Sequence, residues 1–363
     1  MLPPRIYLDH AATTPVLPAA ARAVADGLAG WANPSSPHRE GRAARRALED
    51  ARAAIAAAYG WHGSTLLTGG ASEALSIALG RAQVDRILVS AVEHDACLRA
   101  AGRAEVLPID GDGLLRLDAL DAALAKPGRA LVAVQWANSE TGVRQPIAAV
   151  AARVHAAGHL LLVDGAQMPA GADADVAGHA DLVALSAHKR GGPPGVGALL
   201  VRDLGALAPT GGQEYGYRPG TENLPAALGY AAALAEPEPI ERWAAMRARL
   251  DDAVRRSGGQ VAGDRAQRNP ATAAYRMPGV ASAAQLIRLD LAGFAVSAGS
   301  ACASGSMKPS HVLAAMGWTE EAGREVVRVS FGRGTTDAEV DSFIAAWRDV
   351  ARATRRFAQD RAA

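Results

Sequence analysis

One lysine and one aspartate of this chain have the residue types and the spacing for chemistry on a carbonyl group. Only three lysines occur among the 363 residues, and one of them, Lys189, lies a short way after Asp164. A lysine whose pKa falls in a pocket presents a free amine that can attack an aldehyde. A buried carboxylate can hold a pyridine nitrogen protonated, which turns the ring into an electron sink. The pair therefore predicts a pyridoxal phosphate site.

A glycine turn earlier in the chain is a candidate phosphate site. Residues 68–73 read Thr-Gly-Gly-Ala-Ser-Glu, after an apolar run and before a helical pattern. Such a turn offers free backbone N–H groups and the positive end of a helix dipole to an anion. Two glycines before a helix are more often ordinary turn chemistry. The turn gains weight only because Asp164 and Lys189 follow it.

Strands and helices around these residues are predicted from the sequence pattern. Between residues 65 and 201, short apolar runs alternate with alanine-rich amphipathic segments. This pattern is typical of βαβ units in a mostly parallel sheet covered by helices. Asp164 and Lys189 each come just after an apolar run that predicts a strand of this sheet. Residues 203–225 predict a long functional loop, and the prolines in 236–239 mark a domain junction.

We therefore expect an α/β fold in two domains, because the length exceeds one ordinary core. The larger domain, at residues 11–238, would contain the mostly parallel sheet and the cofactor site. The smaller α+β domain would combine residues 1–10 with residues 239–363.

Composition excludes several classes of function. The formal charge is only +1, so a nucleic-acid partner has no electrostatic basis. No apolar run approaches the roughly 18 residues of a membrane span, and the N-terminus lacks a secretory pattern, so we expect a cytoplasmic protein without a membrane partner. The only two cysteines, Cys97 and Cys302, lie far apart in the sequence, which indicates a reducing compartment and no disulfide scaffold. No metal site is expected.

Short motifs follow one another along nearly the whole chain, and their order is specific. They lie at residues 7–15, 33–38, 92–94, 138–142, 211–214, 218–223, 297–302 and 328–333. The first reads Tyr-Leu-Asp-His-Ala-Ala-Thr-Thr-Pro, and the one that ends at Cys302 reads Ser-Ala-Gly-Ser-Ala-Cys. On these motifs the chain resembles the NifS/IscS-like cysteine desulfurases, in the class V aminotransferase family of fold-type I pyridoxal phosphate enzymes.

The resemblance implies roles around the cofactor ring. Lys189 would bond to the cofactor aldehyde and, once freed by substrate, move the Cα proton. Asp164 would pair with the pyridinium nitrogen, and His94 would stack on the ring and take part in proton transfer. Gln167 and Asn138 would hold the 3-oxygen of the ring, and Asn138 would also contact the substrate.

The resemblance also implies how the phosphate and the substrate are held. The phosphate ligands would be Ala71 through its backbone, Ser72, Ser186, His188, and Thr221 from a second subunit. Arg328 would clamp the substrate carboxylate through a bidentate pair, which suits its planar fork. A homodimer is therefore expected.

The two cysteines receive different interpretations. In the family that the chain resembles, a cysteine on a mobile loop attacks the sulfur of the bound substrate, and Cys302 occupies that position. Its neighbours in 299–306 are small residues that cannot anchor a loop in a core, so we predict a long flexible loop in the smaller domain. Cys97 is predicted to be a small buried hydrophobic residue. Arg333, in the last motif, is expected to form an exposed ion pair or a helix cap.

The resemblance implies conversion of L-cysteine to L-alanine, with sulfur passed from a Cys302 persulfide to an acceptor protein, as in iron–sulfur cluster assembly. A second interpretation is a selenocysteine lyase or another pyridoxal-phosphate-dependent lyase or aminotransferase, which need not depend on Cys302. A third is a cofactor-binding scaffold without turnover. The complete set of catalytic residue types favours the first. Tyr215 and Ala303 stand where the family usually has arginine and threonine, which leaves the acceptor open.

Overall fold

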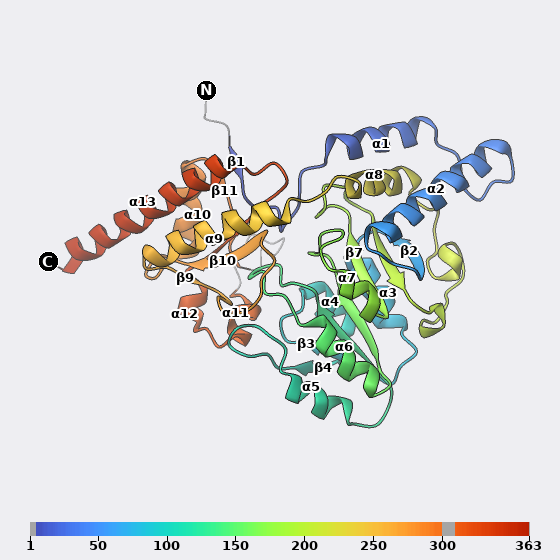
Figure 1. Ribbon diagram of the computed structural model, residues 1–363, viewed down its shortest axis with the longest axis horizontal. Helices are drawn as coiled ribbons and strands as arrows, with labels where there is room; N and C mark the ends of the chain where they lie inside the picture. The colour runs from blue at the N-terminus through green and yellow to red at the C-terminus, as the bar shows by residue number, and fades with distance from the viewer. Residues whose placement is uncertain (1–4, 300–308, 363) are drawn as a thin grey trace.

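A seven-stranded sheet forms the centre of the larger part of the molecule (Figure 1). The computed structural model describes residues 5–299 and 309–362. The sheet order is β2-β8-β7-β6-β5-β3-β4. Its strands are β2 (Ser64–Thr68), β3 (Arg86–Ser90), β4 (Glu105–Leu107), β5 (Ala130–Gln135), β6 (Leu160–Asp164), β7 (Leu182–Ser186) and β8 (Gly197–Val201). Strand β8 runs opposite to the other six strands. The predicted mostly parallel sheet is confirmed.

Helices cover both faces of this sheet, so its central strands are buried throughout. Successive residues alternate between two cores: Leu161 and Val163 of β6 face one core, and Leu160 and Leu162 face the other. Helices α3 (Ala71–Arg81) and α4 (Asp95–Ala101) cover the second face. The first is covered by α2 (Arg39–Ala58), α5 (Leu117–Leu124), α6 (Ile147–Ala156), α7 (Ala174–His179) and α8 (Leu224–Leu234).

The loop predicted at 203–225 contains two short 3-10 helices, η1 (Leu204–Ala206) and η2 (Glu214–Gly216), before α8 begins at Leu224. Glu214 and Tyr215 have positive φ angles of 49° and 56°. The buried Glu214 carboxylate accepts from Arg52 at 2.5 Å and from the Leu67 N–H group of β2 at 2.8 Å. These bonds hold the loop against the sheet and stabilise its unfavourable backbone conformation.

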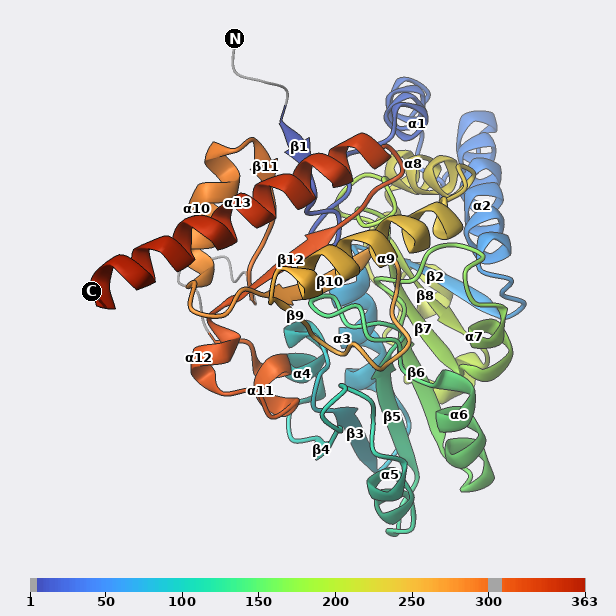
Figure 2. The ribbon, with the colours of Figure 1, turned by 60° about the vertical axis from the view of Figure 1, so that its left-hand side comes forward.

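A smaller sheet lies beside the large one, to its left in Figure 1. It is antiparallel, with β10 (Thr272–Arg276) between β9 (Gln260–Val261) and β12 (Val326–Ser330). Helices α9 (Ile240–Arg256) and α13 (Asp337–Ala362) pack on it and on each other (Figure 2). The remaining helices are α1 (Pro18–Ala29), which packs on α8, and α10 (Ser282–Leu291), α11 (His311–Ala315) and α12 (Glu320–Gly323).

The N-terminal segment joins the two sheet regions. Strand β1 (Ile6–Tyr7) pairs in parallel with β11 (Phe294–Ala295). The Leu8 carbonyl accepts from the Ser330 N–H group at 2.8 Å, whereas the Thr14 N–H group donates to the His188 carbonyl at 2.9 Å. Residues 6–14 therefore pass from the small sheet to the end of a large-sheet strand. No helix in the described ranges is long and apolar enough to cross a membrane.

Candidate active site

A cavity of about 1000 Å³ lies at the carboxyl ends of β5, β6 and β7, and Arg328 of the small sheet reaches it. Ligands of open α/β sheets bind at this end of the strands. The cavity brings together ten of the predicted site residues: Ala71, Ser72, His94, Asn138, Asp164, Gln167, Ser186, His188, Lys189 and Arg328. Thr221 is exposed and is not among the lining residues. Cys302 lies outside the residues that the structure describes.

Lys189 follows β7 and projects into this cavity. Its backbone is fixed, because the Thr14 hydroxyl donates to the Lys189 carbonyl at 3.1 Å. Desolvation lowers the pKa of the Lys189 amine to about 8; the Asp164 carboxylate opposes this shift, and Arg328 adds to it. At neutral pH roughly a tenth of such an amine is unprotonated, against about one part in a few thousand for an ordinary lysine. Lys189 therefore has the nucleophilic form available.

Asp164 is the last residue of β6 and is 7% exposed. One carboxylate oxygen accepts from the Ala166 N–H group at 2.9 Å, which fixes the side chain at the strand end. A carboxylate in this position can pair with a cationic ring nitrogen in the cavity. Its negative charge also acts on Lys189 and His94.

His94 is the N-cap of α4, and its Nδ1 accepts from the Ala96 N–H group at 3.1 Å. Burial lowers the pKa of His94, and the nearby Lys189 charge lowers it further. A neutral imidazole that accepts at Nδ1 carries its proton on Nε2. His94 is thus a neutral ring at the cavity wall that offers one fixed N–H donor.

Glu93 is a cavity residue that sequence analysis missed. It is fully buried, and one carboxyl oxygen accepts from the Gln135 N–H group at 2.9 Å. The other oxygen has no hydrogen-bond partner among the described residues. Burial raises the pKa of Glu93 well above its ordinary value, and the Asp164 charge adds to this effect. Burial thus favours the protonated form of Glu93, and only its place before His94 in a motif could have drawn attention to it.

The glycine turn lies where an anion could be held. Gly70 has a φ of 139°, a conformation that favours glycine, and α3 begins at the next residue. The first intrahelical bond runs from the Ala74 N–H group to the Gly70 carbonyl at 3.1 Å. The preceding N–H groups therefore point out of the helix end. The Ser186 and His188 side chains line the same cavity, so the donor set fits a phosphate group.

The side chains of His188, Gln167 and Asn138 each form a hydrogen bond within the protein. The Nδ1 atom of His188 lies 3.2 Å from the Thr13 hydroxyl, and burial lowers the pKa of His188 to about 4. The Gln167 amide donates to the Ala11 carbonyl at 3.0 Å. Asn138 donates to the Val92 carbonyl at 3.1 Å. Both amides line the cavity, and their role toward a ring oxygen stays a prediction.

Arg328 lies in the middle of β12 and is 7% exposed. Its Nη2 donates to an Asp9 carboxylate oxygen at 2.7 Å, and its Nη1 donates to the Ser139 carbonyl at 3.1 Å. The Arg328 N–H group also donates to the Ser297 carbonyl at 2.6 Å. A guanidinium in this position can receive a carboxylate in the cavity.

The described flanks of the Cys302 segment both reach the cavity. Gly299 lines it on one side and His311 on the other. His311 Nε2 lies 3.0 Å from the Glu93 carbonyl, and the Ser310 hydroxyl donates to Glu140 at 2.6 Å. The predicted flexibility of residues around Cys302 concerns a segment outside the described ranges.

Cys97 is fully buried, and burial raises the pKa of its thiol. A thiol in this state is a poor nucleophile. The prediction that Cys97 is a small buried hydrophobic residue is confirmed.

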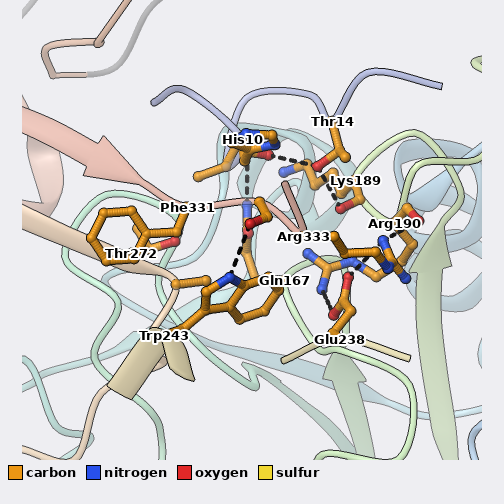
Figure 3. A pocket seen from close by; sticks show the side chains of 13 residues that line it. His10, Thr14, Gln167, Lys189, Arg190, Glu238, Trp243, Thr272, Phe331 and Arg333 are labelled. Atoms are coloured by element: carbon orange, nitrogen blue, oxygen red, sulfur yellow. Dashed lines mark hydrogen bonds and ion pairs between the residues drawn. The ribbon is translucent and has the colours of Figure 1, made fainter. Parts of the chain in front are cut away.

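Lys189 also lines a small cavity of about 10 Å³, together with a buried ion cluster of Arg190, Glu238 and Arg333 (Figure 3). Glu238 pairs with Arg190 at 2.8 Å and with Arg333 at 3.2 Å. Arg333 also donates to the Arg190 carbonyl at 2.9 Å, and its side chain is only 13% exposed. The expectation of an exposed pair or helix cap was wrong for Arg333. Sequence could not reveal that Glu238 and Arg190 meet it at the junction.

The chain is similar to known proteins along most of its length. The family model described as aminotransferase class V matches residues 6–343. A cysteine desulfurase of Cereibacter sphaeroides is 38% identical, covering 94% of each chain. An IscS-like cysteine desulfurase of Mycobacterium tuberculosis is 36% identical, covering 93% of each chain.

Solved structures show the same relationship. The structure of a NifS-like protein from Rickettsia africae has a TM-score of 0.85 at 27% identity and covers 95% of this chain and 99% of its own. The structure of DndA from Streptomyces lividans has a TM-score of 0.72 at 33% identity and covers 90% of this chain and 100% of its own. The chain therefore belongs to the class V aminotransferase family, in its NifS/IscS-like group.

Proposed function

We propose that this protein is a cysteine desulfurase, which converts L-cysteine to L-alanine and leaves the sulfur as a persulfide on Cys302. One observation carries the proposal: Lys189, with its lowered pKa, shares a cavity with Asp164, Arg328 and both described flanks of the Cys302 segment. The relatives named as cysteine desulfurases support the same activity. A structural neighbour, SspA, has been solved in complex with cysteine.

The proposed cofactor is pyridoxal phosphate, and the donor set of the cavity fits its three parts. Asp164 would hold the ring nitrogen, the N–H groups of Ala71 and Ser72 with Ser186 and His188 would hold the phosphate, and Lys189 would meet the aldehyde. When bound, this cofactor supplies an aldehyde and an electron-withdrawing pyridinium ring. The fit rests on the chemistry of these residues, which present a carboxylate, anion-binding donors and an amine in one cavity.

The protein residues divide the remaining work. Arg328 would bind the substrate carboxylate, and the free Lys189 amine would take the Cα proton and return a proton to the carbon skeleton. The Cys302 thiolate would attack the substrate sulfur. A sulfur–sulfur bond forms as the Cβ–S bond breaks, and the electron pair of that bond goes to the carbon fragment, which leaves as alanine after protonation. Cys302 keeps the sulfur as a persulfide.

The proposed assembly is a homodimer in which Thr221 serves the cavity of the second copy. Its exposure in this chain, away from the cavity residues, supports that role. A sulfur-acceptor protein would then take the persulfide sulfur. Chemistry on a free thiolate suits a reducing compartment such as the cytoplasm.

We also propose the domain division at residues 11–238 for the larger domain and at 1–10 with 239–363 for the smaller. Three of the four hydrophobic cores in the described ranges support this division, whereas the fourth joins Val92 and Ile109 to Ala274 and Val326. One core combines Leu8 with residues from Trp243 onward, whereas the two cores of the large sheet lie between Ala44 and Leu234.

The test is alanine and sulfide release from L-cysteine with a reductant, for the parent, Cys302→Ala and Cys97→Ala. Cys97 is the matched control because its thiol is buried and protonated. The parent and Cys97→Ala are expected to release both products in equal amounts, and Cys302→Ala neither. Equal turnover by Cys302→Ala would replace the desulfurase with a direct lyase. A parent that binds cofactor but releases no alanine would favour the scaffold interpretation.

A further inference from the structure

Arg328 is held by the protein on two of its nitrogens. Its Nη2 donates to Asp9 at 2.7 Å, and its Nη1 donates to the Ser139 carbonyl at 3.1 Å. Its Nε is buried and has no hydrogen-bond partner within the described ranges. Both outer nitrogens keep a second hydrogen. The plane of the guanidinium is therefore fixed while donors remain available to a ligand.

Asp9 is itself fixed by its chain segment. Its backbone carbonyl accepts from the Ala12 N–H group at 3.1 Å and from the Tyr7 hydroxyl at 3.3 Å. The next turn is tied to β12, because the Ala11 N–H group donates to the Ser330 hydroxyl at 2.8 Å. The Asp9 side chain is 22% exposed and that of Arg328 is 9% exposed. Asp9 thus meets Arg328 from a turn that is anchored independently of the guanidinium.

A carboxylate bound by both donors of a guanidinium requires that the two groups share a plane. A free arginine side chain has many rotamers, and ordering it on binding costs affinity. A contact that orders the side chain in advance therefore strengthens binding of the ligand. The Asp9 and Ser139 contacts are of this kind, since each holds a different outer nitrogen.

We propose that Asp9 is a positioning residue that fixes the Arg328 fork for the α-carboxylate of the amino acid substrate. This inference rests on the proposed function, because it takes the substrate to be an amino acid bound by Arg328. With Arg328 fixed in this way, the site would select substrates that have a free α-carboxylate next to the amine. Through Asp9, the N-terminal segment becomes part of the substrate site.

A competing role for Asp9 makes the opposite prediction. If Asp9 mainly offset the Arg328 charge, it would repel the substrate carboxylate, and removing its charge would tighten binding. Asp9→Asn separates the two roles, because asparagine keeps an oxygen acceptor at the same place without the charge. Asp9→Ala removes both the charge and the acceptor. Arg5→Ala is the matched control, since it breaks the exposed Arg5–Asp290 pair in the same segment.

The first measurement compares KM and kcat for L-cysteine in the cofactor-loaded parent and the three variants. Positioning predicts that Asp9→Ala raises KM by about tenfold or more while kcat changes less, as expected for a lost hydrogen bond between charged groups. Asp9→Asn is expected to recover most of this loss, and Arg5→Ala to match the parent. Equal KM values in Asp9→Ala and the parent, or a lower KM in either Asp9 variant, would overturn the proposal.

The second measurement is the equilibrium binding of L-alanine and of ethylamine to the holoenzyme. Binding is detected by the change in visible absorption of the cofactor. Ethylamine lacks the carboxylate, so a loss confined to the Arg328 contact weakens L-alanine and leaves ethylamine unchanged. A general structural loss in Asp9→Ala would weaken both ligands and refute the specific role. Parent activity keeps the two proposals apart: a parent that releases alanine upholds the desulfurase even where Asp9 has no effect.

Discussion

The two walls of the cavity are built in different ways. On the large-sheet wall, Asp164 ends β6 and Lys189 follows the neighbouring parallel strand β7, so short stretches of sequence place them. On the small-sheet wall, Arg328 lies inside an antiparallel strand and is held by Asp9, 319 positions away in the sequence. The large-sheet wall would carry the reactive groups, and the small-sheet wall would bind the substrate carboxylate. Reactive groups are thus positioned locally, whereas recognition depends on contacts between distant parts of the chain.

The largest effect is expected when the amine of the large-sheet wall is removed. Lys189→Ala is expected to lower alanine formation by at least about a thousandfold, because no other described lysine lines the cavity. Lys126→Ala is the control, since Lys126 forms an exposed pair with Glu105. Turnover and the visible absorption of the cofactor would be measured together. Turnover retained in Lys189→Ala would mean that the Lys189 amine is not needed for the reaction.

The small-sheet wall is expected to act mainly on binding. Arg328→Lys should raise KM for L-cysteine by about ten- to a hundredfold, with a smaller change in kcat, because lysine lacks the planar fork. Arg324→Lys serves as the control, since Arg324 pairs with Glu320 on the surface. Steady-state kinetics would separate the two parameters. A fall in kcat at unchanged KM would assign Arg328 to the chemical step.

Charges on both walls act on the Lys189 amine, and the pH dependence of its reactivity measures their effect. The apoenzyme would be treated with formaldehyde and a hydride reductant, and methylation of each lysine would be measured by peptide mass spectrometry. The methylation rate of Lys189 should rise with pH with a midpoint at about 8. Removing the Arg328 charge in Arg328→Gln should move this midpoint upward, because Arg328 disfavours the ammonium form. Asp164→Asn should move it downward, because Asp164 favours the ammonium form.

Lys126 provides an exposed internal reference in the same samples. Opposite shifts of the Lys189 midpoint would establish that both walls act on one amine. A midpoint that stays the same in both variants would contradict the electrostatic link.

The smallest effect is expected at Glu93. Its raised pKa favours the protonated acid, which a neutral glutamine resembles, so Glu93→Gln should keep kcat/KM within about threefold. Glu93→Ala leaves the buried Gln135 N–H group without its acceptor and should destabilise the protein by about 1–3 kcal/mol. Kinetics and thermal unfolding would be compared for the two variants. A tenfold loss in Glu93→Gln would indicate an ionised carboxylate there.

Sequence predicted much of the large-sheet wall because its signals are local. Apolar runs gave the strands, and the residues just after them gave Asp164 and Lys189. The glycine turn before α3 and the His94 motif are equally short. The ordered motifs then indicated the family that the comparisons confirm.

The rest depended on contacts that no local pattern contains. Asp9 meets Arg328 only because β1 and β12 lie in the same region of the fold. Glu93 has an unusual environment because burial leaves one of its oxygens unpaired and Asp164 is near. Arg333 is largely buried because Glu238 and Arg190 converge on it. Such packing is set by tertiary structure, so residue type and spacing do not reveal it.

The path of the N-terminal segment also bears on how the protein is made. Strand β1 pairs with β11, and Leu8 is bonded to Ser330. Strand β1 can therefore complete its pairing only after the much later strand β11 has been synthesised, and such distant pairing is slow. Until β12 has been synthesised, Asp9 has no Arg328 beside it. An interrupted translation product could place Lys189 correctly and still lack the means to hold an amino acid.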